Sequence, residues 1–176
     1  IRSMHTCLQI LQVVGGQQGA VWQVRDGDRI LALAALRGDG TEDPHPPLSR
    51  TVIREVLSKQ LGLISEDALM DRRLTTVTNQ PAQSLSFHGL RSILCVPMMF
   101  RGSVMGLIQI SSKSAGSFSE DDLRLVTGMA LEAAVSLASA RLLQERRRMI
   151  QELMNTQVEL KIKMEHRSEN GKHEDV

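Results

Sequence analysis

The sequence predicts an α+β fold, in which helices cover an antiparallel β-sheet on both faces. Two pairs of apolar segments, 20–24 with 29–36 and 91–96 with 104–110, are each joined by a short glycine-containing stretch, as in β-hairpins. Residues 30–36 (ILALAAL) are apolar at every position, so we expect this strand to be covered on both faces. Helical patterns at the two ends of the chain can supply one of the covering layers.

The N-terminal segment has the pattern of an amphipathic helix. Apolar residues recur at helical spacing over residues 2–14, and Gly15-Gly16 ends the segment. The first hairpin follows, with its turn at residues 26–28 (DGD). The start of the chain therefore predicts a helix that leads into the first two strands.

After the first hairpin we expect a loop, a short helix and a brief strand. Residues 37–48 concentrate glycine, acidic residues and proline, which favour a loop. Ser49 is suited to cap a helix, and residues 62–65 (GLIS) predict the strand. The apolar face of the short helix is expected to contain Val52, Ile53, Val56 and Leu57.

The next region combines a long irregular segment with the second hairpin. Residues 66–89 are polar and irregular, and loops of this length in a compact domain are usually functional or mobile, so we expect a lid over a ligand site. Pro97 follows the first strand of the second hairpin. Because proline has no N–H to donate, we expect it at the end of its strand or at a sheet edge.

The stretch 117–123 (SFSEDDL) predicts the start of a long helix. Ser119 and Asp122 have the spacing of a capping box, and Phe118 can pack against Leu123. Helical patterning then continues almost without a breaker, so one long helix or two nearly continuous ones are expected. The residues predicted to face the sheet are Leu123, Val126, Ala130, Ala133 and Leu137.

Beyond Arg141 the same helix predicts a short coiled coil. Apolar residues fall in a heptad register that Arg146 and Gln157 interrupt. The alternative is a single solvated helix, because charged residues fill the remaining positions. The predicted dimer-interface residues are Leu143, Ile150, Leu153 and Leu160, with Met164 in the same register.

Composition and charge argue against several classes of function. With 21 Lys and Arg against 20 Asp and Glu, the net charge of +1 gives no overall field that would attract nucleic acid or an anionic membrane. No uninterrupted apolar run reaches the roughly 18 residues of a membrane span, and the N-terminus lacks the pattern of a signal peptide. We expect a cytoplasmic chain that does not contact nucleic acid or a membrane directly and binds no metal.

The order of these elements, and three of their sequences, resemble a GAF domain. This family is the ligand-binding sensory module of phosphodiesterases, phytochromes and many bacterial signalling and transcription-regulator proteins. The most specific matches are RSILCVPM (91–98), VMGLIQI (104–110) and FSEDDL (118–123), whereas DRRL (71–74) lacks the proline and aromatic residue of the family's lid segment. The resemblance covers roughly residues 2–142. It implies an α/β/α sandwich with the terminal helices on one face of the sheet and a ligand pocket on the other.

The resemblance also implies which positions lie near a ligand. Cyclic GMP or AMP is left open but not favoured, because apolar residues such as Leu36 and Leu90 replace the polar groups that would hold a purine and its phosphate. Arg37 leaves an anionic ligand open, and the sequence identifies no cofactor. The implied ligand-binding residues, each of which could instead fill the core or the surface, are Ala20, Leu36, Arg37, Val52, Ile53, Asp67, Ser86 and Leu90.

Cys95 is the candidate for catalysis, since one GAF-like enzyme type reduces free methionine sulfoxide with cysteines in its pocket. That chemistry needs a thiolate of low pKa and a second thiol within reach. Cys95 lies between Leu94 and Val96, where burial would raise its pKa, and Cys7 belongs to the first helix. Glycine-rich nucleotide-binding motifs and paired-histidine metal motifs are absent from the sequence. We therefore expect a regulatory domain and no enzyme.

The sequence as a whole predicts a GAF domain at residues 1–142, a helical linker at 143–169 and a disordered tail at 170–176. We expect the domain to bind a small molecule, to form a homodimer and to control, through the linker, an output domain outside this chain. The alternative is a ligand-free GAF scaffold that only dimerises or docks a partner protein.

Overall fold

The structure is a computed structural model. It describes residues 10–25, 29–44, 46–47, 49–74 and 88–170. The chain divides into two compact units, Ile1–Leu137 and Ala138–Val176, which are described separately. Residues 171–176 of the predicted tail lie outside the described residues.

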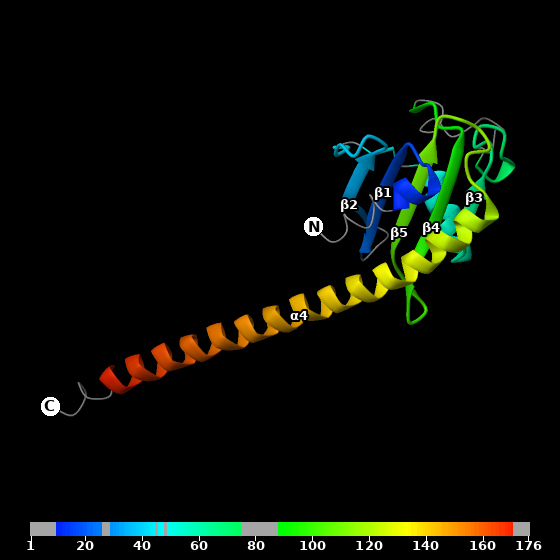
Figure 1. The fold of residues 1–176 in the computed structure, drawn as a ribbon. Helices are drawn as coiled ribbons and strands as arrows, with labels where there is room; N and C mark the ends of the chain where they lie inside the picture. Colours follow the sequence, from blue (N-terminus) through cyan, green and yellow to red (C-terminus); the bar gives the residue numbers. More distant parts are fainter. Residues whose placement is uncertain (1–9, 26–28, 45, 48, 75–87, 171–176) are drawn as a thin grey trace. The chain divides into compact units, whose positions relative to one another are not determined.

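The first unit contains a five-stranded sheet with the strand order β2-β1-β5-β4-β3 (Figure 1). Both predicted hairpins are present, β1 with β2 and β4 with β5, and the predicted brief strand is β3. All four pairs of neighbouring strands are antiparallel, which confirms the predicted α+β fold. The strands are β1 Gln18–Arg25, β2 Arg29–Arg37, β3 Leu63–Ser65, β4 Ser92–Phe100 and β5 Ser103–Ser112.

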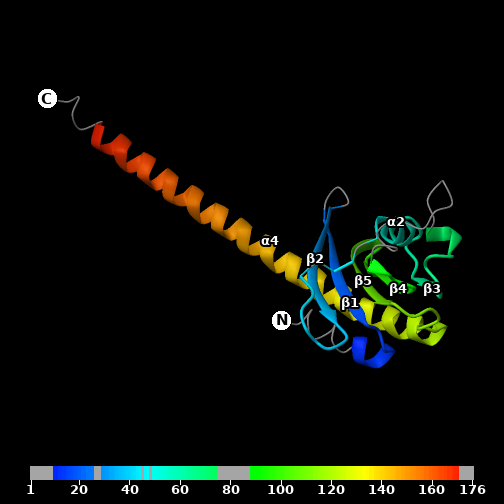
Figure 2. The same ribbon diagram turned by 90° about the horizontal axis from the view of Figure 1, so that it is seen from above.

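Helices lie on both faces of this sheet (Figure 2). One face carries α2 (Arg50–Lys59), the short helix that the sequence predicts. The other face carries the helical residues 10–14 and the first part of α4 (Glu120–Asn170). Residues 2–9 of the predicted first helix lie outside the described residues.

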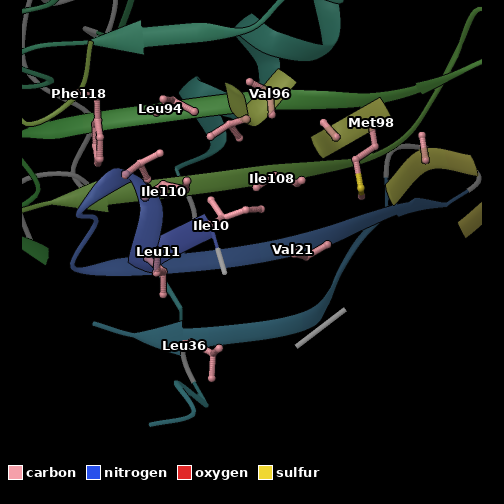
Figure 3. Close-up of a cluster of buried hydrophobic side chains, with 14 residues drawn as sticks. Ile10, Leu11, Val21, Leu36, Leu94, Val96, Met98, Ile108, Ile110 and Phe118 are labelled. Carbon is pink, nitrogen blue, oxygen red and sulfur yellow. The ribbon is translucent and has the colours of Figure 1, made fainter. Parts of the chain in front are cut away.

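An apolar cluster fills the space between the sheet and the first part of α4, and we call it the α4-side cluster (Figure 3). Val126, Ala130 and Ala134 lie one turn apart on α4 and are fully buried, so small side chains let the helix approach the sheet closely. This confirms the predicted sheet-facing stripe, to which Leu123, Ala133 and Leu137 add partly buried side chains. The buried members from the other elements are Ile10, Leu11, Val14, Val21, Leu36, Leu94, Val96, Met98, Ile108, Ile110 and Phe118.

The start of α4 has the predicted capping box. The Ser119 N–H donates to Asp122 Oδ2 at 2.8 Å, and the Asp122 N–H donates back to Ser119 Oγ at 3.3 Å. Three acidic residues, Glu120, Asp121 and Asp122, occupy the first turn, where the helix dipole favours negative charge. α4 then continues as a single helix, as one of the two predicted alternatives requires.

Part of α4 is also long and apolar enough to cross a membrane, judged by length and composition alone. Within the first unit, however, its apolar residues Val126, Ala130 and Ala134 are buried against the sheet. A core helix that is mostly buried passes the same test, whereas only 22% of the apolar window of α4 is buried. The start of α4 therefore packs in the core of the first unit, and one such helix is weak evidence for a membrane span.

The prediction that strand 30–36 is covered on both faces is wrong. The strand is β2, which lies at the edge of the sheet, and Leu31 and Leu33 are 42% and 40% exposed. A register shift in the pairing of β1 with β2 leaves Leu33 without a partner residue on β1, because Val21 pairs with Ala34 and Trp22 with Ala32. An apolar run can therefore belong to an edge strand whose alanines need little cover.

Pro97 lies inside β4, opposite Leu107, and not at the end of its strand. The pairing of β3 with β4 stops at Leu63 and Cys95, so no described segment pairs with β4 on that side at the level of Pro97. The prediction of a strand end is wrong, and that of a sheet edge is confirmed. A missing N–H at this edge removes no hydrogen bond to β3.

Two glycines give a matched test of this packing. A methyl group at Gly106 on β5 would overlap the end of the Met98 side chain and the carbonyl oxygen of Trp22, whereas one at Gly128 on α4 meets no atom within 4 Å. We expect Gly106→Ala to lower the free energy of unfolding by about 1–3 kcal/mol through overpacking. Gly128→Ala should raise it by about 0.5–1 kcal/mol through helix propensity.

Urea denaturation of the two variants and the parent chain, followed by far-UV circular dichroism, measures both changes. A Gly106→Ala variant as stable as the parent would show that β1 and β4 are not packed against β5 as closely as the structure has them.

Candidate functional site

The face of the sheet opposite α4 holds a second apolar cluster, the α2-side cluster, where the family resemblance places a ligand. Helix α2 contributes Val52, Ile53 and Val56, and the segment after β3 contributes Ala68 and Leu74. All of these side chains are at most 6% exposed. The remaining buried members are Ala20, Trp22, Leu63, Leu90, Ile93, Cys95 and Leu107.

Local sequence signals hold α2 over the sheet. Ser49 is the N-cap in extended conformation, and its side chain accepts from the Val52 N–H at 3.5 Å. Gln60 ends the helix in the left-handed conformation and donates its N–H to the Val56 carbonyl at 2.8 Å. The buried stripe of α2 therefore faces the sheet, as predicted.

An ion pair fixes the segment that follows β3 to the start of β4. Arg91 Nε donates to Asp67 Oδ1 at 2.9 Å and Arg91 Nη2 to Asp67 Oδ2, a bidentate pair. These hydrogen bonds from Arg91 hold the pKa of the Asp67 carboxyl below its ordinary value, against partial desolvation. The Ala68 N–H also donates to the Arg91 carbonyl, at 2.6 Å. Asp67 thus anchors residues 66–74, the segment after β3 that lies over the α2-side cluster. We call this segment the cover.

A small cavity lies at the rim of this cluster, between β1, β5 and the loop before α2. Its volume is about 10 Å³, room for at most one water molecule. Gln109 Nε2 donates to the Pro47 carbonyl at 3.0 Å, which fixes the orientation of the amide. The lining residues are Gln18, Gly19, Ala20, Asp43, Pro46, Pro47, Gln109 and Ser111.

The oxygens around this cavity favour a hydrogen-bond donor. Gln18 Oε1 and Gln109 Oε1 are buried and accept no hydrogen bond within the part of the chain that the structure describes. The nearby Asp43 carboxylate pairs with Arg37, at 3.3 Å from Nη2 to Oδ1. A single water or one donor group of a ligand would satisfy these acceptors, since a buried acceptor without a donor costs about 1–3 kcal/mol.

The structure gathers four of the eight predicted ligand-binding residues in the α2-side cluster: Ala20, Val52, Ile53 and Leu90. Leu36 lies on the opposite face, in the α4-side cluster. Arg37 is half exposed beside Asp43, and Asp67 is engaged with Arg91. Ser86 lies outside the described residues. Whether any of these positions contacts a ligand stays a prediction.

Two polar residues of this region were not singled out from the sequence. Gln109 is the one polar residue within the apolar segment VMGLIQI, and that contrast is a signal that sequence reading could have used. Arg91 begins the RSILCVPM match, but its partner Asp67 lies 24 residues earlier, a pairing that requires the fold.

Cys95 has none of the properties of a reactive thiol. It is 1% exposed, and burial raises the pKa of its thiol to about 12. The second cysteine, Cys7, lies outside the described residues. No group of three or more His, Cys, Asp or Glu side chains suited to a metal ion occurs among the residues that the structure describes.

Comparison with known proteins identifies the family of this chain. The sequence model of the GAF domain family matches residues 3–137, more than half of the chain. A curated relative, the probable 3',5'-cyclic phosphodiesterase pde-5 of Caenorhabditis elegans, is 27% identical over 113 residues, a match of 64% of this chain but only 15% of that protein.

Solved structures show the same fold. The GAF domain of an Acinetobacter phosphoenolpyruvate-protein phosphotransferase is 18% identical, with a TM-score of 0.61 over 81% of this chain and 87% of that one. The type II free methionine-R-sulfoxide reductase of Thermoplasma acidophilum is 16% identical, also with a TM-score of 0.61, over 78% and 91% of the two chains. The chain therefore belongs to the GAF domain family, the sensory and regulatory modules of signalling proteins.

Proposed function

We propose that this GAF domain is a non-catalytic sensor that binds a small molecule on the α2 side of its sheet and passes the resulting change to α4. The proposal rests on one observation: strands β4 and β5 contribute side chains to both apolar clusters. On β4, Ile93 and Cys95 belong to the α2-side cluster, and the alternating Leu94 and Val96 belong to the α4-side cluster. All four are at most 1% exposed.

Close packing on both faces couples the two sides. Protein interiors are packed at the density of organic crystals, so a strand cannot move on one face without disturbing the other. A ligand that displaces the α2-side cover would therefore shift the residues beneath α4. Such a ligand acts by binding one arrangement more tightly than the other.

The cover over the α2-side cluster is the element suited to move. Arg73, whose side chain is half exposed, ties it to β3 through a hydrogen bond to the Ile64 carbonyl at 2.7 Å, and the ion pair of Asp67 with Arg91 ties it to the start of β4. Exposed ion pairs contribute only about 0–1 kcal/mol, whereas a bidentate pair such as Asp67–Arg91 contributes more. Lifting Leu74 out of the cluster would cost about 1.5–3 kcal/mol. A ligand that prefers the open arrangement by a few kcal/mol can offset this cost.

The size of the cavity beside Gln109 bears on the size of a ligand that it could hold. Drug-sized ligands occupy roughly 300–1,000 Å³, far more than the 10 Å³ cavity beside Gln109. A ligand of nucleotide size would therefore not fit this cavity as it stands. Cyclic nucleotides are kept as probes because the relative from Caenorhabditis elegans is named as a cyclic phosphodiesterase.

The proposed output is carried by a dimer formed through α4. The heptad residues Leu143, Ile150, Leu153 and Leu160 are 47–70% exposed in the second unit. Apolar residues this exposed on a helix favour association with another helix. An output domain outside this chain would receive the change through this linker. A cytoplasmic location and a role in transcription regulation remain part of the proposal.

A ligand-free scaffold is the second candidate. The burial of the α2-side cluster favours it, because its fully packed apolar residues need no small molecule to be stable. In this case the domain would only dimerise or hold a partner protein.

Native mass spectrometry of the purified chain separates the two candidates. The sensor predicts a dimer that either retains a small molecule or gains the mass of added cyclic GMP or cyclic AMP. A dimer that gains no mass from its expression host or from these probes favours the scaffold. A monomer without bound mass would contradict transmission through α4.

The thiol of Cys95 gives a test of the non-catalytic assignment. In a Cys7→Ser background, we expect no reaction with a thiol reagent at pH 8 until the chain is unfolded, because the Cys95 thiol is buried and its pKa is raised to about 12. Rapid labelling of the folded chain, or loss of methionine sulfoxide reduction on Cys95→Ala, would overturn the assignment.

The same shift predicts a pH dependence of stability. The folded pKa lies above the unfolded value of about 8.5, so above pH 8.5 the thiol ionises in the unfolded chain but not in the folded one. The stabilising contribution of the neutral thiol to the free energy of unfolding is therefore complete below about pH 8.5 and is lost as pH rises toward 12. The expected slope is about 1.4 kcal/mol per pH unit in this window. Urea denaturation at several pH values measures it, and Cys95→Ala is the control that should lack this component.

A further inference from the structure

α4 carries a stripe of exposed apolar residues with an eleven-residue repeat. Leu131, Leu142, Leu153 and Met164 are spaced by eleven residues, and so are Met149 and Leu160. Val135 begins a third column, which continues with Arg146 and Gln157. The apolar members of the three columns just named are 52–72% exposed.

This repeat accounts for exposed residues that the heptad register leaves out. Both registers contain Leu153, Leu160 and Met164. Toward the N-terminus they separate: the heptad runs through Ile150 and Leu143 and would continue with Ser139, Ser136 and Glu132, which are polar. The eleven-residue register runs through Met149 and Leu142 and continues with Ala138, Val135 and Leu131. All three are apolar; Ala138 is buried, and Val135 and Leu131 are exposed in the first unit.

We infer that the partner of this stripe is α4 of a second copy of the chain, paired in parallel and in the eleven-residue register. This inference rests on the proposed dimer and replaces its heptad register. Eleven residues in three turns give 3.67 residues per turn, so the stripe runs almost straight along the helix. The stripe extends over three repeats, and a helix with the same repeat can contact it along its full length. A second copy of α4 is such a helix.

Parallel pairing puts like columns side by side. Arg146 of one helix then faces Arg146 of the other. Glu145, which precedes Arg146 in each helix, supplies a counter-charge. A polar residue in such a column lowers stability but favours one register over its alternatives. Pairing in this register would include Leu131 and Val135 of the sensory unit in the interface, so the interface would begin within the GAF domain.

Disulfide cross-linking distinguishes the registers in a Cys7→Ser, Cys95→Ala background. Single cysteines at neighbouring positions serve as matched pairs: Leu142→Cys against Leu143→Cys, and Met149→Cys against Ile150→Cys. We expect the 142 and 149 variants to form intermolecular disulfides several-fold faster than the 143 and 150 variants, since a disulfide needs Cβ atoms about 4 Å apart. Circular dichroism checks that each variant is folded.

Association is tested separately by sedimentation equilibrium. Val135→Asp should weaken the dimer at least tenfold, whereas Val158→Asp should not, because Val158 is 58% exposed but lies off both registers. Faster cross-linking at 143 and 150 in an intact dimer would overturn the register alone. A further variant, Leu153→Cys, tests the orientation. If Leu142→Cys chains form disulfides with Leu153→Cys chains in a mixture, and neither variant forms them alone, the parallel orientation would be overturned. A parent chain that stays monomeric would overturn the proposed dimer as well.

Discussion

Burial of strands β4 and β5 on both faces is the constraint on which the rest of the domain depends. Each strand sends alternate side chains into two apolar clusters, so Ile93 and Leu94 are neighbours in sequence but belong to different layers. Neither layer can be covered by the sheet itself. The short helix α2 covers one and α4 covers the other, which explains why a chain of this length uses helices from both its middle and its C-terminal part (Figure 2).

The two layers differ in how firmly they are closed. On the α4 side, small residues one turn apart bring a long helix close to the sheet, with a capping box at its start. On the α2 side, a ten-residue helix and the cover close the layer, and the cover is tied down by Arg91 and Arg73, both partly exposed. Their carboxylate partners Asp67 and Asp71 are 23% and 12% exposed, so these polar contacts are only partly shielded from water. In the proposed function, the α2 side is the side that opens, and α4 carries the displacement.

Most of the fold could be predicted from the sequence because its signals are local. The capping box at Ser119 and the alternation within β4 and β5 each act over a few residues. The exposure of Leu31 and Leu33 could not be predicted, since an apolar run does not reveal whether its strand is central or at an edge. Pro97 shows the same limit, because its edge exists only where β3 ends. At the candidate site, the apolar positions were within reach of sequence patterns, whereas the Asp67–Arg91 pair depends on contacts between distant segments.

Coupling between the two layers is tested most directly by methyl NMR of the alanines on α4. Leu74→Ala removes buried volume from the α2-side cluster only, and Leu31→Ala on the exposed edge strand is the matched control. If the strands transmit displacement, the methyl resonances of Ala130 and Ala134 shift in Leu74→Ala and stay in place in Leu31→Ala. Resonance changes confined to the α2-side cluster would show that the two layers are independent, and the sensor interpretation would not hold.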